Sequence, residues 1–279
     1  MNGRKVTVGM DGSVAAFRAL DAAAREALLR GARLEIVHCV ADLDEAAPVV
    51  RSAAARVRER HPDLAVTAVP VVGDPVDVLE ERSRTAELTV VGSRGAGGLG
   101  GMLLHSVSRR LAARTLGPLL VVRGCGVHTS GTEASGGVLL GVESDTDAEA
   151  ALFAFEEACL RGSRLRVLHA WTYRQPVNAR AELAAPVRDE IEAQARRAAV
   201  VPGNAVAALR SVVPGLAVET AAVRATACHT LLEATRGTDL VVIAAHRRPS
   251  RIGLQLGQVT DALLRHSHCP VAVIPVPRT

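Results

Sequence analysis

The feature that most constrains the fold of this 279-residue chain is an internal duplication. The segment KVTVGMDGSVAAFRALDAAAREALLRGARLEIVHCV at 5–40 returns as GVLLGVESDTDAEAALFAFEEACLRGSRLRVLHAW at 137–171, with Asp11 matched by Glu143. The end of the pattern returns too, because AELTVVG and GPLLVV of the first copy correspond to TDLVVIA and CPVAVI of the second. A repeat of this length indicates a tandem duplication of one domain.

The segment GCGVHTSGTEASGG joins the two copies. Its Gly, Ser and Thr content is typical of a flexible connector. We therefore predict a first domain over 1–124, a linker over 125–136 and a second domain over 137–279. The second copy carries about 20 extra residues in its middle part, between Trp171 and Val223.

Each copy alternates short β-branched runs with segments of helical apolar spacing. In the first copy, strands are predicted at 6–10, 34–40, 64–72, 88–91 and 119–123, and helices at 13–30, 46–60, 74–84 and from about 106. Strands joined by helices pair in parallel through right-handed crossovers, which predicts an α/β fold of two tandem doubly wound domains. Ligands of such sheets bind beyond the carboxyl ends of the strands, where the strand order reverses.

Composition excludes several functional classes. The chain has 33 Lys and Arg against 29 Asp and Glu, spread over both copies, so it lacks the basic stripe typical of nucleic-acid binding. We find no apolar run long enough to span a bilayer, and no signal-peptide pattern. The five cysteines are scattered singly without a CxxC pair, which argues against a zinc site or a disulfide framework. We expect a cytoplasmic protein that binds neither nucleic acid nor membrane, and no metal site.

A glycine-rich segment follows the strand predicted at 88–91. Gly92 and Gly95 allow the backbone to approach an anion, Ser106 opens the next helix with a hydroxyl donor, and Arg94 supplies a positive charge. These residues are typical of a phosphate-binding loop. A surface loop in which Ser106 caps the following helix accounts for them equally well.

The turn after the first predicted strand carries an acid. The Walker A loop is excluded because the only lysine is Lys5, which does not follow a glycine in a GxxxxGK[ST] pattern. A dinucleotide fingerprint is excluded because Asp11 stands where the pyrophosphate would lie. A carboxylate at this position suits a ribose hydroxyl or an exocyclic amine, although it also suits the dipole of the following helix.

These residues resemble the universal stress protein family of the adenine-nucleotide-binding type. The family signature is Gly, two residues, Gly, nine residues, then Gly followed by Ser or Thr. Gly92, Gly95 and Ser106 fit it, whereas His105 replaces the third glycine. The resemblance covers both copies and implies a five-stranded parallel sheet in each, of order 3-2-1-4-5, and ATP or a related adenine nucleotide as ligand, with Mg²⁺ accompanying ATP.

The resemblance also implies where the nucleotide lies. Adenine would lie at the ends of the first two strands, the ribose at the end of the fourth, and the phosphates along the loop and the helix that follows. The implied binding residues are Gly9, Met10, Asp11, Cys39, Val91, Gly92, Arg94, Gly95, His105, Ser106 and Val107.

His105 is the main departure of the first copy from this signature. A side chain obstructs a position that requires a positive φ angle, but it leaves the backbone N–H in place. We therefore expect weakened but retained nucleotide binding. His105→Gly is predicted to raise the affinity for ATP measured by calorimetry, and an unchanged or lower affinity would refute this interpretation.

The second copy departs further. Glu143 replaces the aspartate, and Ala244 and Arg247 stand where the first copy has Gly92 and Gly95. Alanine and arginine lack the backbone freedom of glycine, so this copy is expected to keep the fold without the nucleotide geometry, and we predict at most one ATP per chain. The cluster His246, Arg247, Arg248 and Arg251 suits a different anion or a solvated loop.

Three interpretations of function stay open: a non-enzymatic stress-response protein that binds ATP as a regulatory ligand, a scaffold for an unknown protein partner that binds no nucleotide, and a slow ATPase. No nucleophile or general base can be assigned, so an enzyme is the less favoured class. By resemblance, 119–123 and 271–276 form a pseudo-dimer contact within the chain, and two chains can associate further.

Two further expectations concern single side chains. His38 and His169 occupy matching strand ends, and each is expected to be half-buried and to satisfy a backbone group. The aromatic residues are few, and four of the five lie between Phe153 and Tyr173. If they cluster, they mark a core or packing surface rather than the nucleotide site.

Overall fold

The computed structural model describes residues 3–41, 43–93, 107–123, 136–144, 147–173, 184–245, 247–250 and 253–276, and gives no side chains for 43–47, 184–187, 247–250 and 253–255. The chain divides into two compact units, one of Met1–Gly131 with Ala245–Thr279 and the other of Thr132–Ala244. Most of the predicted linker lies outside the described residues, so the boundaries at 124 and 137 stay a prediction.

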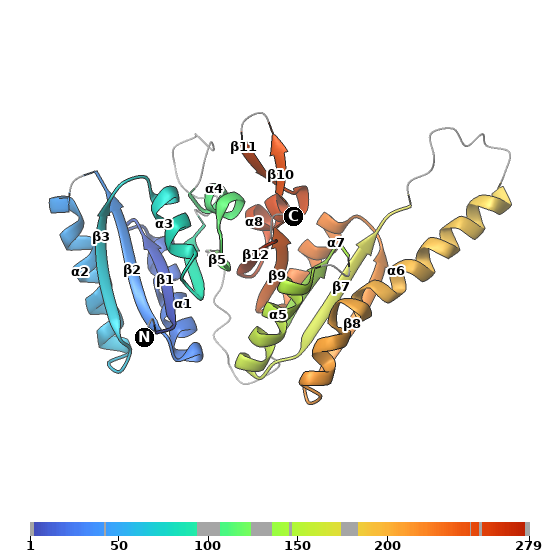
Figure 1. Cartoon of the computed structure of the whole chain (residues 1–279), viewed down its shortest axis with the longest axis horizontal. Helices are drawn as coiled ribbons and strands as arrows, with labels where there is room; N and C mark the ends of the chain where they lie inside the picture. Colours follow the sequence, from blue (N-terminus) through green and yellow to red (C-terminus); the bar gives the residue numbers. More distant parts are fainter. Residues whose placement is uncertain are drawn as a thin grey trace. The chain divides into compact units, whose positions relative to one another are not determined.

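The first copy forms the predicted alternation of strands and helices (Figure 1). Its elements are β1 (Lys5–Met10), α1 (Val14–Arg30), β2 (Arg33–Val40), α2 (Leu43–Arg60), β3 (Val66–Val72), α3 (Pro75–Ser83), β4 (Leu88–Gly92), α4 (Val107–Arg114) and β5 (Leu119–Val122). The strands pair in parallel in the order β3-β2-β1-β4-β5. The doubly wound fold and the 3-2-1-4-5 order are therefore confirmed for this copy.

Local sequence explains where α1 begins and ends. The Ser13 hydroxyl accepts a hydrogen bond from the Ala16 N–H at 3.2 Å, which satisfies one of the free donors of the first turn. Gly31 ends the helix with a φ of 58°, a left-handed conformation that glycine adopts at no steric cost. Between them, a run of alanines lets the helix pack closely on the sheet: Ala19, Ala23 and Ala27 are fully buried.

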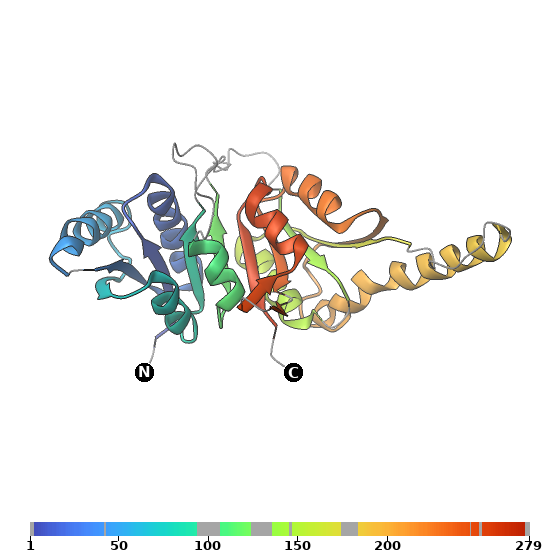
Figure 2. The same cartoon turned by 90° about the horizontal axis from the view of Figure 1, so that it is seen from above.

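The two faces of this sheet are covered by different helix pairs. Helices α1 and α2 contact each other on one face, and α3 and α4 contact each other on the opposite face (Figure 2). This division follows from right-handed crossovers, because the chain winds outward from β1 to β3 and then returns past β1 to β4. The strand order therefore reverses between β1 and β4.

The same unit contains the C-terminal elements of the chain. These are β10 (Arg247–Ser250), β11 (Gly253–Leu256), α8 (Gln258–His266) and β12 (Val271–Pro275). β10 and β11 form an antiparallel hairpin, and β12 pairs antiparallel with β5, matching Val271 with Val121. The strand contact expected between 119–123 and 271–276 is therefore present.

The second unit contains the remaining elements of the second copy. These are β6 (Val138–Val142), α5 (Ala148–Arg161), β7 (Leu165–Trp171), α6 (Ala184–Val212), β8 (Val218–Arg224), α7 (Ala227–Ala234), the 3₁₀ turn η1 (Thr235–Gly237) and β9 (Leu240–Ala245). The strands are parallel, in the order β9-β6-β7-β8. Because β6 to β9 are the first to fourth strands of the second copy, this order corresponds to 4-1-2-3. It is the predicted order 3-2-1-4 in reverse.

Much of the extra length of the second copy lies in α6, which has 29 residues against 18 in its counterpart α2. Figures 1 and 2 show α6 continuing past the strands that it covers. Pro202 lies inside this helix without ending it. Among the described helices of the chain, none is long and apolar enough to cross a bilayer.

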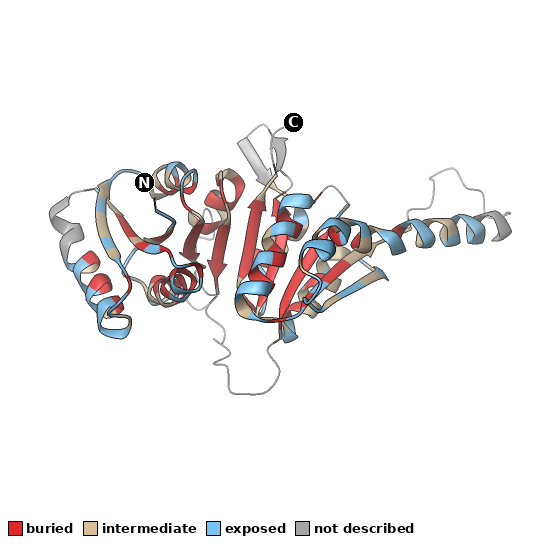
Figure 3. Cartoon of the chain, turned by 60° about the horizontal axis from the view of Figure 1, so that its bottom comes forward, coloured by how far each residue is buried: buried red, intermediate tan, exposed pale blue. Residues whose placement is uncertain are grey.

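Buried residues concentrate on the strands and on the inward sides of the helices (Figure 3). The cores are made almost entirely of Val, Leu, Ile and Ala, and Phe155 is the one aromatic side chain among the buried hydrophobic residues of the described part. Small aliphatic side chains let helices lie close to the sheet. The core composition expected from the scarcity of aromatics is therefore present.

Each copy buries one ion pair inside its first helix. Glu26 pairs with Arg30 in α1, and Glu157 pairs with Arg161 at the matching positions of α5. The Glu26 and Arg30 side chains are 8% and 3% exposed. Charged residues four apart on a helix usually indicate a solvated face, and sequence reasoning did not find these buried pairs.

Candidate functional site

The carboxyl ends of β1 and β4 form the predicted ligand-binding edge of the first copy. Val8 of β1 pairs with Val90 of β4, so the two strands advance together to Asp11 and Ser93 just beyond their ends. Neighbouring strands lie about 4.8 Å apart. The turn that carries Asp11 and the start of the glycine-rich segment therefore lie side by side, at the reversal of strand order.

Asp11 is exposed and forms a tight turn. Its Oδ1 atom accepts a hydrogen bond from the Ser13 N–H at 2.9 Å, and Gly12 between them has a φ of 75°. This Asx turn fixes the carboxylate at the start of α1. A carboxylate only accepts hydrogen bonds, so a ligand at this point must offer a hydroxyl or an N–H group.

Gly92 is required by packing. A Cβ atom at this position would lie 2.6 Å from the Ala15 carbonyl oxygen and 2.7 Å from its carbon. Both are backbone atoms of α1, so no side-chain rotation relieves the contact. The glycine lets α1 approach the end of β4 closely, and this explains the residue without reference to a ligand.

Ser93 is a candidate ligand contact that sequence reasoning missed. The residue is 6% exposed, and its Oγ atom is buried with no hydrogen-bond partner among the described residues. Its backbone N–H donates to the Val122 carbonyl at 2.8 Å, so the N–H is satisfied whereas the hydroxyl is not. A buried hydroxyl without a partner is costly unless another group, such as a ligand atom, satisfies it.

Met10, Cys39 and Val91 supply the apolar part of the edge. Met10 and Val91 are buried, at 5% and 4% exposure, and Cys39 is half-buried. Burial raises the pKa of the Cys39 thiol, with Arg82 opposing the shift and Asp74 adding to it. The thiol is therefore protonated at neutral pH and acts as an apolar surface.

His38 and His169 have the structural role expected of them. His38 Nδ1 lies 2.7 Å from the Met10 carbonyl oxygen, and His169 Nδ1 lies 3.0 Å from the Val142 carbonyl oxygen. A carbonyl only accepts, so Nδ1 carries the proton in both rings. Each histidine joins the end of one strand to the end of its neighbour, and this prediction is confirmed.

Helix α4, which begins at Val107, is held in place by arginines. Arg110 pairs at 3.4 Å with Asp74, the N-cap residue of α3, and Arg114 pairs at 2.7 Å with Asp77 of α3. Of the predicted phosphate-binding residues, Arg94, Gly95, His105 and Ser106 lie outside the described residues. The structure brings together Gly9 and Met10 on β1, Asp11 just after it, and Val91 and Gly92 on β4, and places Cys39 near the end of β2.

The matching edge of the second copy has a different geometry. The segment after β9 forms the β10–β11 hairpin, in which Arg247 pairs with Leu256 and Ser250 with Gly253. An antiparallel ladder uses backbone N–H groups that a phosphate loop would direct at its ligand. At the other strand, the Glu143 N–H donates to Asp147 Oδ2 at 2.8 Å.

A cavity of about 400 Å³ lies at this edge, against α6. Its lining includes Glu143, His169 and Trp171 from the strand ends and Arg197 from the helix. The interpretation of the aromatic residues as core holds for Phe155, which is buried. Trp171 is half-buried and lies in the lining of this cavity.

Three comparisons relate the chain to known proteins. A model of the universal stress protein family matches residues 3–123 and 137–275. A universal stress protein of Mycolicibacterium smegmatis is 28% identical over 291 residues, which cover 96% of each chain. A universal stress protein of Mycobacterium tuberculosis is 29% identical over 290 residues, again covering 96% of each chain.

A solved structure agrees in fold. A universal stress protein from Archaeoglobus fulgidus superposes on 99% of this chain and 99% of its own, with a TM-score of 0.63 and 16% sequence identity. The matched length includes both copies, so the tandem arrangement is shared along with the α/β fold.

Proposed function

The chain belongs to the universal stress protein family, and we propose that its first copy binds ATP or a related adenine nucleotide as a regulatory ligand. In this proposal the second copy contributes no nucleotide site. One observation carries the proposal: two different polar groups lie at the same edge of the sheet. These are the Asp11 carboxylate after β1 and the buried Ser93 hydroxyl after β4.

The described residues suit the parts of a nucleoside. Asp11 offers an acceptor to a ribose hydroxyl or an exocyclic amine, whereas Ser93 offers a buried hydroxyl that is otherwise unsatisfied. Met10, Val91 and the protonated Cys39 thiol provide apolar contact for a base. Magnesium enters the proposal only as the ion that accompanies the phosphates of ATP.

A scaffold without a nucleotide is the second candidate, and one observation favours it. Gly92 is fully explained by its contact with the Ala15 backbone, so its presence does not require a ligand. In that case the carboxyl edge of the first copy would have no nucleotide to bind, and the protein would act through a protein partner. The two candidates differ in whether adenine nucleotides stabilise the chain.

Asp11→Ala is predicted to weaken ATP binding by about tenfold, since one charge-assisted hydrogen bond contributes about 1.5–3 kcal/mol. The matched control is Glu143→Ala, which removes the corresponding acid of the second copy and should leave the affinity unchanged. Titration calorimetry of the full chain should give one ATP site in the wild type and in Glu143→Ala.

Other outcomes separate the alternatives. Two tight sites, or equal losses in both variants, would contradict a nucleotide site confined to the first copy. No heat and no thermal shift with ATP, AMP or cyclic AMP would favour the scaffold. Steady release of inorganic phosphate from ATP would indicate a slow ATPase instead of a regulatory ligand. Analysis of nucleotide that co-purifies with the protein tests the same proposal without choosing a ligand in advance.

We also propose that the protein works in the cytoplasm and associates into homodimers. Support for the compartment comes from the cysteines: Cys39, Cys159 and Cys228 form no disulfide in the described part of the chain. A reducing compartment keeps such thiols unpaired. The dimer rests on family resemblance alone, and light scattering of the purified chain tests it.

A further inference from the structure

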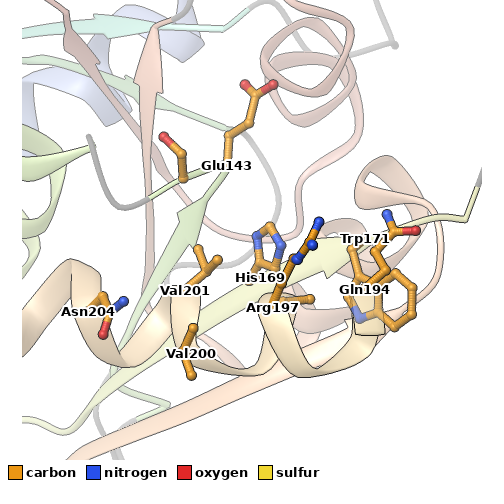
Figure 4. Close-up of a pocket in the computed structure, with 10 residues that line it drawn as sticks. Glu143, His169, Trp171, Gln194, Arg197, Val200, Val201 and Asn204 are labelled. Carbon is orange, nitrogen blue, oxygen red and sulfur yellow. The ribbon is translucent and has the colours of Figure 1, made fainter. Parts of the chain in front are cut away.

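The cavity of the second copy has the position of a small-molecule site. It is an open hollow of about 400 Å³ on the surface of the second copy. It lies beyond the carboxyl ends of β6 and β7, where Glu143 follows β6 and His169 and Trp171 end β7. Helix α6 closes one side through Gln194, Arg197 and the residues after them, as Figure 4 shows.

Trp171 gives this cavity an aromatic wall that the first copy lacks. It is the only tryptophan of the chain, and the first copy has Val40 at the matching strand end. The Arg224 guanidinium lies 5.8 Å from the centroid of its ring, and the two residues are paired in register between β7 and β8. An aromatic ring in a lined cavity suits stacking of a planar ligand.

Two hydrogen bonds attach the segment around Trp171 to the helix. Gln194 Nε2 of α6 donates to the Thr172 carbonyl at 3.3 Å, and the Tyr173 hydroxyl donates to Glu190 Oε2 at 2.9 Å. The lengthened α6 supplies both partners. The segment that follows Trp171 is therefore attached to α6 at two points.

Arg197 supplies the positive charge of the cavity. Its side chain is exposed, and none of the side chains that the structure describes forms an ion pair with it. Figure 4 shows His169, Arg197 and Trp171 gathered on one side of the cavity, with Glu143 at another. A guanidinium binds a carboxylate through two parallel N–H···O hydrogen bonds.

His169 supplies an acceptor. Its Nδ1 atom is committed to the Val142 carbonyl, so Nε2 is the remaining polar atom of the ring. A ligand hydroxyl can donate to this nitrogen. The lining thus combines the Trp171 ring, the Arg197 cation and the His169 ring, with the Glu143 carboxylate at another side.

We propose that this cavity binds a small planar aromatic acid, with its ring beside Trp171, its carboxylate on Arg197 and a hydroxyl substituent donating to His169. A nucleoside triphosphate fits poorly, because the backbone after β9 is used in the β10–β11 hairpin and Arg197 is a single cation against several phosphate charges. The second copy therefore has a ligand of its own chemistry, independent of nucleotide binding in the first copy.

The test uses 4-hydroxybenzoate as the probe and the full chain as the protein. Because Trp171 is the only tryptophan, the chain has a single indole N–H resonance, and 4-hydroxybenzoate should shift it in a saturable way. The neutral isostere 4-hydroxybenzamide should bind at least about tenfold more weakly, since it lacks the charge that pairs with Arg197. Acetate, which has the charge without the ring, should leave the resonance in place.

Two arginine variants give a matched comparison. Arg197→Gln should weaken 4-hydroxybenzoate binding by about tenfold, whereas Arg196→Gln, at the adjacent exposed position outside the lining, should not change it. Both positions are on the surface of α6, so both variants should fold, and their melting temperatures check this. Trp171→Val, which installs the residue of the first copy, should abolish the heat of binding in calorimetry.

Three results would overturn the proposal. The first is an indole resonance that 4-hydroxybenzoate does not move at any concentration. The second is binding that Arg197→Gln and Arg196→Gln weaken equally or not at all. The third is a resonance that ATP moves while 4-hydroxybenzoate does not, which would make the cavity a nucleotide site.

Discussion

Glu26→Ala should lower the free energy of unfolding by about 3 kcal/mol, because it leaves the Arg30 guanidinium buried without its main partner. The Arg30 side chain is 3% exposed, and its next carboxylate, that of Glu87, is 4.0 Å away from Nε. A buried charge that loses its nearest carboxylate costs more than a surface charge that does so. Urea unfolding followed by circular dichroism measures the change.

Glu192→Ala is the matched control for this experiment. It breaks a pair of the same four-residue spacing with Arg188, but both side chains are exposed, at 55% and 82%. Exposed helix pairs contribute about 0.3–0.5 kcal/mol, so little stability should be lost. The double variant Glu26→Leu with Arg30→Met removes both charges and should recover most of the loss. Equal losses in Glu26→Ala and Glu192→Ala would show that burial does not govern the pair.

Gly92→Ala is expected to lower the free energy of unfolding by about 2 kcal/mol and to reduce ATP affinity by at least about tenfold. The added methyl group would lie 2.6 Å from the Ala15 carbonyl oxygen, so α1 or the end of β4 must move. Such a movement displaces Asp11 and Ser93, the two candidate ligand contacts, relative to each other. Denaturant unfolding and calorimetry with ATP measure the two effects separately.

Gly203→Ala gives the comparison for this variant. A Cβ atom at Gly203 meets nothing within 4 Å, and alanine favours a helix over glycine by about 1 kcal/mol. This variant should therefore be at least as stable as the wild type and should bind ATP normally. If Gly92→Ala is as stable as the wild type and binds ATP normally, the close approach of α1 to β4 does not require a glycine at position 92. A loss of affinity without a loss of stability would point to a direct contact with the nucleotide.

The sequence predicts most elements of the first copy because its boundaries have local chemical causes. Ser13 and Gly31 delimit α1 through capping, and Asp74 accepts from the Val76 N–H at 2.8 Å to begin α3. Where such signals are weak, the prediction fails. Helix α2 begins at Leu43, earlier than the predicted 46, and Pro48 lies inside it.

The candidate site is less predictable than the fold. The sequence identifies Asp11 and Gly92 as candidate site residues because they stand at the ends of predicted strands. The structural reason for Gly92 is the close approach of α1 to β4, which sequence spacing does not encode. Ser93 is recognised only by its missing hydrogen-bond partner in the described structure. The cavity beside Trp171 lies against α6, and the sequence indicates extra residues in this region without indicating their conformation.

The pairing of β5 with β12 has a consequence for biosynthesis. Val121 pairs with Val271, 150 positions later, so the edge of β5 stays open until nearly the whole chain has left the ribosome. At about 5–20 residues per second, this interval lasts roughly 8–30 s. An unpaired apolar edge exposed for that time is a template for pairing with another chain. Nascent chains of this protein are therefore expected to need chaperone protection of β5 until the last strand is made.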